Sequence, residues 1–367
     1  MPRQFLPPLG AAVFATITIG AFVFSPHRAP PPPSQAAAVA LSATSTTTPT
    51  LTTSSTTDAV AAPQVTPAAD LTPVSPSASE PKLPPPVSNE VLTGAGAKLL
   101  DATVNILCIA RRTSGFESIS GSGVIIDPRG LILTAAHIGQ YFLLADAKPS
   151  SITCTIRTGA PARDAYYAKV AYVSPSWIED NAKNLSETSP KGTGENDFAI
   201  LAITSSAVHA RLPDTYPYVP LSHDTVIIGE KLAISGYAAQ YLHGGQIEYS
   251  LYPTIVFDSI TNRYTFDTNT VDVLSVAGTA AAQEGSSGGG MADAQGGLVG
   301  LITTSSIKGD ISDHILNAIT ALHIRTSFAA DGSANFDSYF ANSSPSALVN
   351  NFNTEAHKLE KVLLEAN

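Results

Sequence analysis

Eleven short apolar runs separated by polar turns dominate residues 104–304, and they limit the fold more than any other feature of the sequence. Runs of this length, with alternating or β-branched residues, are typical of strands. They fall into two sets, so the sequence predicts an all-β fold built from two groups of strands. The first set comprises 104–110, 121–127, 131–137, 151–157, 166–173 and 198–203, and the second comprises 226–235, 246–257, 263–266, 271–276 and 297–304.

A serine flanked by glycines marks residues 284–290, whose sequence is EGSSGGG. Glycine adopts backbone conformations that other residues avoid, and it lets a substrate backbone come close. A nucleophilic serine needs such a turn, which can also direct the amide N–H groups of Gly285 and Ser287 at a developing oxyanion. Taken alone, the stretch also fits a flexible surface turn, because Gly-Ser runs are common in linkers.

Two other residues, both far upstream in the chain, favour the catalytic interpretation of this serine. His137 ends the run 131–137, and Asp197 directly precedes the run 198–203. Acyl transfer by serine needs a base that takes the hydroxyl proton and a carboxylate that fixes the tautomer of that base. His137, Asp197 and Ser287 therefore form a candidate catalytic triad, each at the end of a strand-like run.

On these motifs the chain resembles a trypsin-like serine protease of the chymotrypsin fold, and more closely the HtrA/DegP-type bacterial branch. The matching motifs are TAAH up to His137, NDFAIL around Asp197 and GSSGG around Ser287. Gly290 departs from the family pattern, which usually has proline there, so we expect a looser turn. The resemblance implies two six-stranded Greek-key β-barrels within residues 89–330, with His137 and Asp197 on the first barrel and Ser287 on the second.

The resemblance also implies where the substrate pocket lies. In this fold one wall precedes the catalytic serine, and the other is the strand after the serine loop. Trypsin-like enzymes that prefer Arg or Lys carry a buried aspartate in the first wall, and an unpaired buried cation is costly. This sequence has no such acid there, so we expect a preference for small to medium apolar residues. The wall positions are Ala281, Ala282, Ile302, Thr303 and Thr304.

The two cysteines, Cys108 and Cys154, fall on the first and fourth predicted strands. In the implied Greek-key barrel these two strands lie side by side. An extracytoplasmic setting permits oxidation, so we expect a Cys108–Cys154 disulfide or closely placed thiols. The alternative is two buried free cysteines that act as small hydrophobic residues.

The N-terminal part differs sharply in composition from the rest. Residues 5–24 carry no charge and are long enough to span a membrane, so 1–24 is either an anchor or a signal peptide. Residues 25–88 are rich in Pro, Ser, Thr and Ala, with too few apolar side chains to offset chain entropy, and we expect a disordered linker. The predicted location is extracytoplasmic, in the cell envelope or secreted.

The C-terminal part is predicted to be helical. One helix is expected to start at Ser312, and a second, within the extension 331–367, at Ser344. The second has an apolar stripe that either packs against the barrels or forms an oligomer contact. Too few residues follow the protease-like part for the PDZ domain that HtrA-type enzymes often carry. The stripe consists of Leu348, Phe352, Ala356, Leu359 and Leu363.

The net charge of the chain and the spacing of its histidines limit which functions we expect. The net charge of −10 and the pI of about 5.2 argue against binding to nucleic acid, which needs a basic footprint. The remaining histidines show no metal-ligand spacing. The leading hypothesis is a serine endopeptidase that acts on proteins or peptides and needs neither metal nor organic cofactor. The alternative is a catalytically silent binding module that keeps the protease fold and is tethered to the cell envelope.

Overall fold

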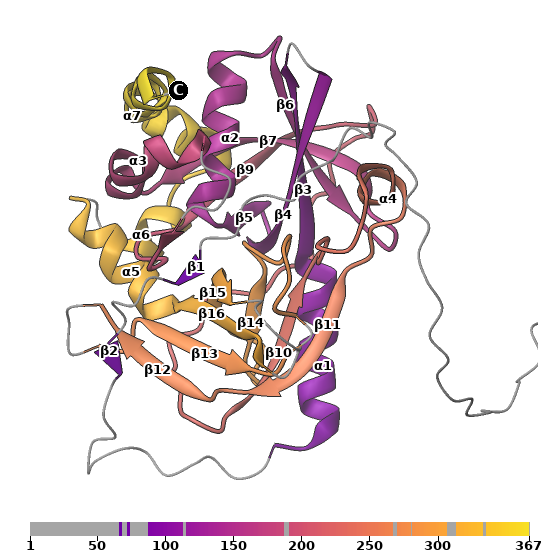
Figure 1. Cartoon of the computed structure of the whole chain (residues 1–367), viewed down its shortest axis with the longest axis vertical. Helices are drawn as coiled ribbons and strands as arrows, with labels where there is room; N and C mark the ends of the chain where they lie inside the picture. Colours follow the sequence, from indigo (N-terminus) through magenta and orange to yellow (C-terminus); the bar gives the residue numbers. More distant parts are fainter. Residues whose placement is uncertain are drawn as a thin grey trace, which may run out of the picture. The chain divides into compact units, whose positions relative to one another are not determined.

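A closed barrel, an eight-stranded sheet, a two-stranded sheet and the helices around them make up the described part of the chain (Figure 1). No helix in this part combines the length and apolarity needed to cross a membrane, and the predicted membrane-targeting segment 5–24 lies outside it. The computed structural model describes residues 66–67, 72–73, 87–112, 115–186, 191–266, 270–279, 281–306, 313–332 and 335–366, all within the compact unit Ser55–Asn367.

The first set of strands closes into a six-stranded barrel in the order β3-β4-β5-β9-β7-β6, as predicted. Every neighbouring pair is antiparallel. Ile106, Ile132 and Ile156 have no exposed surface, in keeping with strands whose alternate residues share one buried face. The strands are β3 (Thr103–Arg112), β4 (Gly115–Asp127), β5 (Leu131–Thr134), β6 (Ile152–Thr158), β7 (Arg163–Val173) and β9 (Ala199–Ser206).

The second set forms a curled sheet rather than the closed six-stranded barrel that we expected. Its order is β11-β10-β14-β15-β16-β13-β12-β2, and no pairing joins the edge strands β11 and β2 within the described residues. Helix α1 (Asn89–Ala102) packs on β10, β11 and β14 near the β11 edge, with Gly96 against the ring of Phe257. The strands are β2 (Thr72–Pro73), β10 (Lys231–Gly236), β11 (Thr254–Ser259), β12 (Asn262–Thr265), β13 (Val273–Ala277), β14 (Gly290–Ala292), β15 (Leu298–Ser306) and β16 (Ile315–Thr320).

Three segments differ in secondary structure from the sequence prediction. The run 131–137 is predicted as a strand up to His137, but β5 ends at Thr134 and helix α2 (Ala136–Ala147) begins two residues later. The predicted strand 246–257 begins with helix α4 (Gly244–Tyr249), because the Gln246 side chain accepts a hydrogen bond from the His243 N–H and completes a capping box. The helix expected after Ser312 is instead strand β16, and the chain becomes helical only at α5 (Ala321–Ala330). β16 pairs with both β13 and β15, and this pairing overrides the helix-like spacing of its apolar residues.

Four residues of the predicted linker pair with the folded part. Strand β1 (Thr66–Pro67) is parallel to β8 (Lys191–Gly192), a short strand just before Asp197. Strand β2 is antiparallel to β12 and extends the second sheet. The linker is therefore attached at these two places, while the rest of 25–86 lies outside the described residues.

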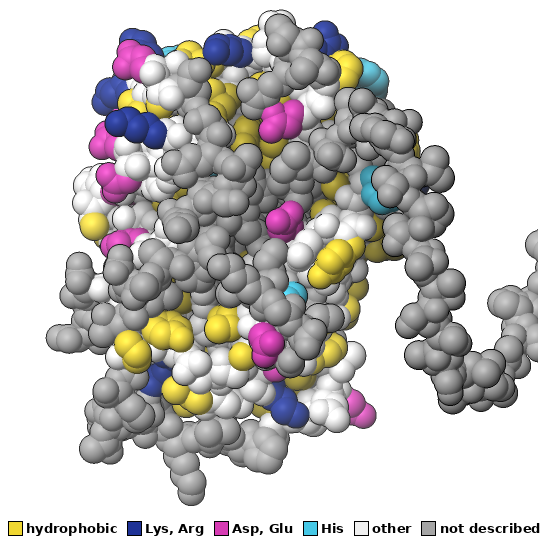
Figure 2. Space-filling view, in the orientation of Figure 1, with side chains coloured by type: hydrophobic (Ala, Val, Ile, Leu, Met, Phe, Trp, Pro, Cys, Tyr) yellow, Lys and Arg dark blue, Asp and Glu magenta, His cyan; other side chains and the backbone are white. Residues whose placement is uncertain are grey.

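Among the remaining helices, α2 and α7 pack against the first barrel, α3 and η1 pack on α7, and α6 packs on α5. The apolar stripe of α7 is buried in the chain, since Leu348, Phe352, Leu359 and Leu363 contribute to the main core and α7 contacts β7 and β9. On the face shown in Figure 2, acidic and basic side chains are mixed at the upper left, where Figure 1 places α3 and α7. These helices are α2 (Ala136–Ala147), α3 (Pro175–Asn181), the 3-10 helix η1 (Ala182–Ser186), α6 (Phe336–Ala341) and α7 (Pro345–Ala366).

The two cysteines form the predicted disulfide. Cys108 on β3 and Cys154 on β6 are directly opposed in the antiparallel ladder and are bonded to each other. The bond links the first and fourth strands of the barrel, which are neighbours because the Greek-key order brings them together. Disulfides persist in oxidising compartments, so the bond indicates an extracytoplasmic environment.

Removing this disulfide is expected to lower the free energy of unfolding by about 2–5 kcal/mol, because it closes a loop in the unfolded chain. The change is C108S together with C154S, and the measurement is denaturant unfolding with and without reductant. Reductant should destabilise the wild type and leave the double variant unchanged. Equal unfolding midpoints for oxidised wild type and double variant would contradict the prediction.

Candidate active site

His137 lies in the first turn of α2, directly after β5 and the Ala135 N-cap residue. Ala135 has no side chain that can cap the helix, and the Asp197 carboxylate takes that role. Asp197 Oδ1 accepts the His137 backbone N–H at 2.9 Å, and Asp197 Oδ2 lies 2.7 Å from His137 Nδ1. One carboxylate thus satisfies an otherwise unpaired helix amide and orients the imidazole ring.

Asp197 lies in the loop between β8 and β9 and has no exposed surface. Asn196 before it has a φ of 57°, a left-handed conformation that asparagine tolerates better than most residues. The Asn196 side chain accepts a hydrogen bond from Ser327 Oγ at 2.6 Å and donates one to Ser176 Oγ at 3.4 Å. Residues from α5 and α3 therefore hold the turn that directs the carboxylate at His137.

Ser287 lies in a glycine-rich loop, residues 283–289, which we call the nucleophile loop. Gly288 has a φ of 83°, and a Cβ atom there would lie 2.1 Å from the Ser122 carbonyl oxygen and 2.5 Å from Thr134 Oγ1. Only glycine allows this close approach. Thr134 is three residues before His137, so Gly288, the residue after Ser287, lies against the strand that leads to the β5–α2 junction.

The serine and histidine side chains are not hydrogen-bonded to each other in this structure. Ser287 Oγ and His137 Nε2 are both buried, and neither has a hydrogen-bond partner among the described residues. Bonds between a nucleophile and its base are often long without substrate and tighten in the complex. The arrangement is therefore a buried, oriented imidazole and an unpaired hydroxyl on neighbouring elements.

The backbone amides predicted to form an oxyanion hole are free within the described residues. Neither the Gly285 nor the Ser287 N–H donates a hydrogen bond to them, although the Ser286 N–H donates to the Gln283 carbonyl at 3.2 Å. The Glu284 carbonyl accepts the Ala239 N–H at 2.7 Å, and burial raises the pKa of the Glu284 carboxyl above its ordinary value. Two free amides at a glycine turn have the chemistry needed to bind an oxyanion.

Gly290 ends this loop and is closely packed. A Cβ atom there would lie 2.5 Å from Leu298 Cδ1 and 2.8 Å from Val124 Cγ2. The residue also pairs with Ser235 in the sheet. The departure from the family's proline therefore provides space for packing, and the looser turn that we expected is not what these contacts indicate.

The residues predicted to line the substrate pocket are all buried, but they lie in different surroundings. Ala281, Ala282 and Ile302 belong to the apolar core of the second sheet. Thr304 Oγ1 accepts a hydrogen bond from Asn317 at 3.2 Å inside that sheet. Thr303 lies on the side of the Asp197 loop, since a Cβ atom on Gly194 would be 2.7 Å from its hydroxyl oxygen.

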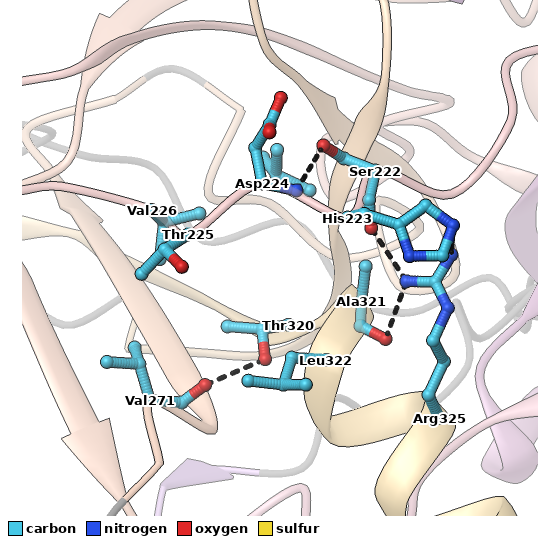
Figure 3. A pocket seen from close by; sticks show the side chains of 11 residues that line it. Ser222, His223, Asp224, Thr225, Val226, Val271, Thr320, Ala321, Leu322 and Arg325 are labelled. Atoms are coloured by element: carbon cyan, nitrogen blue, oxygen red, sulfur yellow. Dashed lines mark hydrogen bonds between the residues drawn. The ribbon is translucent and has the colours of Figure 1, made fainter. Parts of the chain in front are cut away.

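A well-defined cavity lies away from these residues (Figure 3). It has a volume of about 170 Å³ and is lined by residues that include Val271, Thr320 and Arg325. The Arg325 guanidinium is already bound to Asp337 and to the Ser222 carbonyl, the latter at 2.6 Å. None of the predicted catalytic or pocket residues lines this cavity.

Ser122 and Ala239 contact the nucleophile loop, but sequence reasoning did not single them out. Ser122 stands between Gly121 and Gly123, and this small-residue run was a usable sign of close backbone approach. Ala239 contacts the loop through its backbone amide, a group that does not depend on residue type and so could not be recognised from the sequence.

Residues 121–301 match the family model described as trypsin-like peptidase domain, and the matched stretch contains His137, Asp197 and Ser287. No curated protein matches the chain.

Two solved structures of Rv3671c from M. tuberculosis are similar to the chain. The inactive form, a serine-to-alanine mutant from strain H37Rv, has a TM-score of 0.41 and 18% identity, covering 68% of this chain and 96% of its own. The active form of the protease has a TM-score of 0.41 and 18% identity, with 71% and 96% covered. The family match supports a trypsin-like protease, with the trypsin-like peptidase domain over residues 121–301.

Proposed function

We propose that the protein is a serine endopeptidase that hydrolyses peptide bonds through an acyl-enzyme. The observation that carries the proposal is the double contact of one buried carboxylate with His137, at its backbone N–H and at Nδ1. It leaves Nε2 as a buried ring nitrogen without a hydrogen-bond partner among the described residues. A histidine held in this way is suited to act as a general base.

In the proposed reaction, His137 Nε2 takes the proton of Ser287 as its Oγ attacks the substrate carbonyl carbon. The N–H groups of Gly285 and Ser287 bind the resulting oxyanion, and Asp197 stabilises the imidazolium. The imidazolium then gives its proton to the leaving amine, the C–N bond breaks, and the acyl group stays on Ser287. Water, deprotonated by His137, hydrolyses the ester and restores the serine.

The proposed setting is the cell envelope or the space outside it, as for an HtrA/DegP-like enzyme. The disulfide supports an oxidising compartment, and the uncharged segment 5–24 supplies a membrane attachment or a signal. Protein or peptide substrates fit the family match, and the net charge of −10 disfavours nucleic acid.

A second candidate is a catalytically silent module that binds proteins with the same fold. The unbonded Ser287 Oγ and His137 Nε2 favour it, because an inactive relative has no need to keep them in contact. A fluorophosphonate probe separates the two functions, since it phosphonylates only an activated serine.

The labelling experiment uses the full chain, with H137A beside the wild type. The endopeptidase proposal expects a phosphonylated peptide that carries the label on Ser287, and loss of labelling in H137A. The adjacent Ser286 is the internal control, because it is also buried and should stay unlabelled. Folded protein that takes no label supports the binding module.

The substrate preference is expected to favour Ala, Val or Leu before the cleaved bond. No carboxylate occurs among Ala281, Ala282 and residues 302–304, so a cation would be buried without a partner. Each added methylene should increase kcat/KM about fourfold, from about 0.8 kcal/mol of burial, until the pocket is full. A peptide library with matched Ala, Val, Leu, Lys and Arg positions measures this, and dominance of Lys or Arg would refute it.

A further inference from the structure

Ser122 belongs to the first barrel, yet its polar atoms bond to the nucleophile loop. It lies on β4 opposite Asn105 of β3, and it has no exposed surface. Its N–H donates to the Ser287 carbonyl at 2.8 Å, and its hydroxyl donates to the Gly285 carbonyl at 2.7 Å. The same hydroxyl oxygen accepts the Tyr237 N–H at 2.8 Å.

The segment 237–239 holds the same loop from another side. The Ala239 N–H donates to the Glu284 carbonyl at 2.7 Å. In a planar trans peptide the C=O and N–H groups point in opposite directions, so the Gly285 N–H is directed away from Ala239. That N–H donates to nothing within the described residues, and it is one of the two proposed oxyanion donors.

The segment and the loop are in backbone contact at Gly285. This residue has a φ of 90°, and a Cβ atom on it would lie 2.6 Å from the Tyr237 carbonyl oxygen and 3.0 Å from the Ala239 amide nitrogen. Because a side chain at position 285 would not fit here, the loop packs closely on the segment, and we expect a shift of the segment to disturb the Gly285 peptide. The Ser122 hydroxyl is hydrogen-bonded to the Tyr237 N–H of the segment and to the Gly285 carbonyl of the loop.

We propose that Ser122 is a positioning residue for the oxyanion hole. Its hydroxyl joins the Tyr237 amide to the Gly285 carbonyl and thereby keeps the N–H groups of Gly285 and Ser287 directed at the reacting carbonyl oxygen. Ser122 acts through the loop and does not touch the substrate. The inference rests on the proposed protease function and deepens it.

The test compares S122A with S120A in the full-length protein. Ser120 is a matched control, because it lies two residues away on the same strand, is equally buried, and accepts a hydrogen bond from Asn105 at 3.0 Å without contacting the nucleophile loop. Thermal unfolding of both variants measures the structural cost of losing a buried hydroxyl. Peptide hydrolysis, binding of a peptide boronate, and the pH dependence of kcat/KM measure the function.

For S122A we expect kcat to fall about 10- to 100-fold, because complete loss of an oxyanion donor costs about 10²–10³-fold and misdirection costs less. KM should stay within about twofold, and boronate affinity should fall by the same factor as kcat. The pH midpoint should not move, since the contacts of His137 with Asp197 are unchanged. S120A should have wild-type kcat despite a similar loss of stability.

Equal kcat in S122A and S120A would overturn the inference, as would a fall in kcat without a fall in boronate affinity. Both outcomes leave the protease function standing, because the wild type still cleaves peptides. A wild type that neither cleaves peptides nor takes the fluorophosphonate label would overturn the proposed function and the inference with it. If S122A does not fold, S122C replaces it in the comparison with S120A. Cysteine has a side chain of similar shape to serine but forms weaker hydrogen bonds.

Discussion

Replacing Ser287 with alanine is expected to lower kcat for peptide hydrolysis by about 10⁶-fold, as loss of the nucleophile does in established serine proteases. The hydroxyl has no hydrogen-bond partner within the described residues, so no native bond is broken by its removal. The loop conformation is held by backbone contacts, including the Ser122 N–H to the Ser287 carbonyl. Stability should therefore change little, while the covalent step becomes impossible.

The measurement is single-turnover cleavage of a peptide substrate, with thermal unfolding as the check on folding. A residual rate about 10³–10⁴-fold above water is compatible with the assignment, because the oxyanion hole and substrate binding remain. S286A is the control variant, since it removes a neighbouring buried hydroxyl and should keep most of the activity. Wild-type-like turnover in S287A would show that another group performs the attack.

Replacing Asp197 with asparagine is expected to lower kcat by about 10⁴-fold at neutral pH with the fold retained. The two carboxylate oxygens now accept the His137 N–H and the Nδ1–H. An asparagine has only one oxygen. If it bonds to the backbone N–H, its amide group donates to Nδ1, which forces the imidazole proton onto Nε2. That tautomer cannot accept the serine proton.

In the opposite orientation the asparagine oxygen accepts from Nδ1 and its NH₂ group faces the backbone N–H of His137. Both of these groups are donors, so the buried backbone amide would be left unpaired. The experiment measures kcat of D197N and its fluorophosphonate labelling rate, and both should fall together. Asp293, which is also buried and directly follows β14 of the second sheet, provides the control D293N. Activity of D197N within tenfold of the wild type would contradict a role for Asp197 in fixing the tautomer.

Local sequence patterns were sufficient to predict the strands of the first barrel and to select the candidate catalytic residues. Six strands between residues 104 and 203 were predicted because each is a short apolar run bounded by turns. His137, Asp197 and Ser287 were found because the chemistry needs these residue types within short motifs. The disulfide followed from the strand order that the resemblance implied, and the structure confirms it.

Tertiary contacts decided the second sheet. Residues 315–322 have the apolar spacing of a helix face, yet 315–320 form a strand because β13 and β15 offer hydrogen bonds on both sides. Within the described residues the sheet stays open between β11 and β2, and a local pattern of apolar residues carries no information about whether edges meet. Secondary structure in this part depends on partners distant in the chain.

The sequence by itself determined the candidate side chains for the chemistry, since a base, a carboxylate and a nucleophile are recognisable by residue type. Only the tertiary structure decided how they are held. The contacts of Ser122 with the nucleophile loop, and of the Ala239 amide with Glu284, join residues that are 163 and 45 positions apart. Most of these bonds use backbone N–H and C=O groups, which every residue except proline carries, and so no residue type marks them in advance.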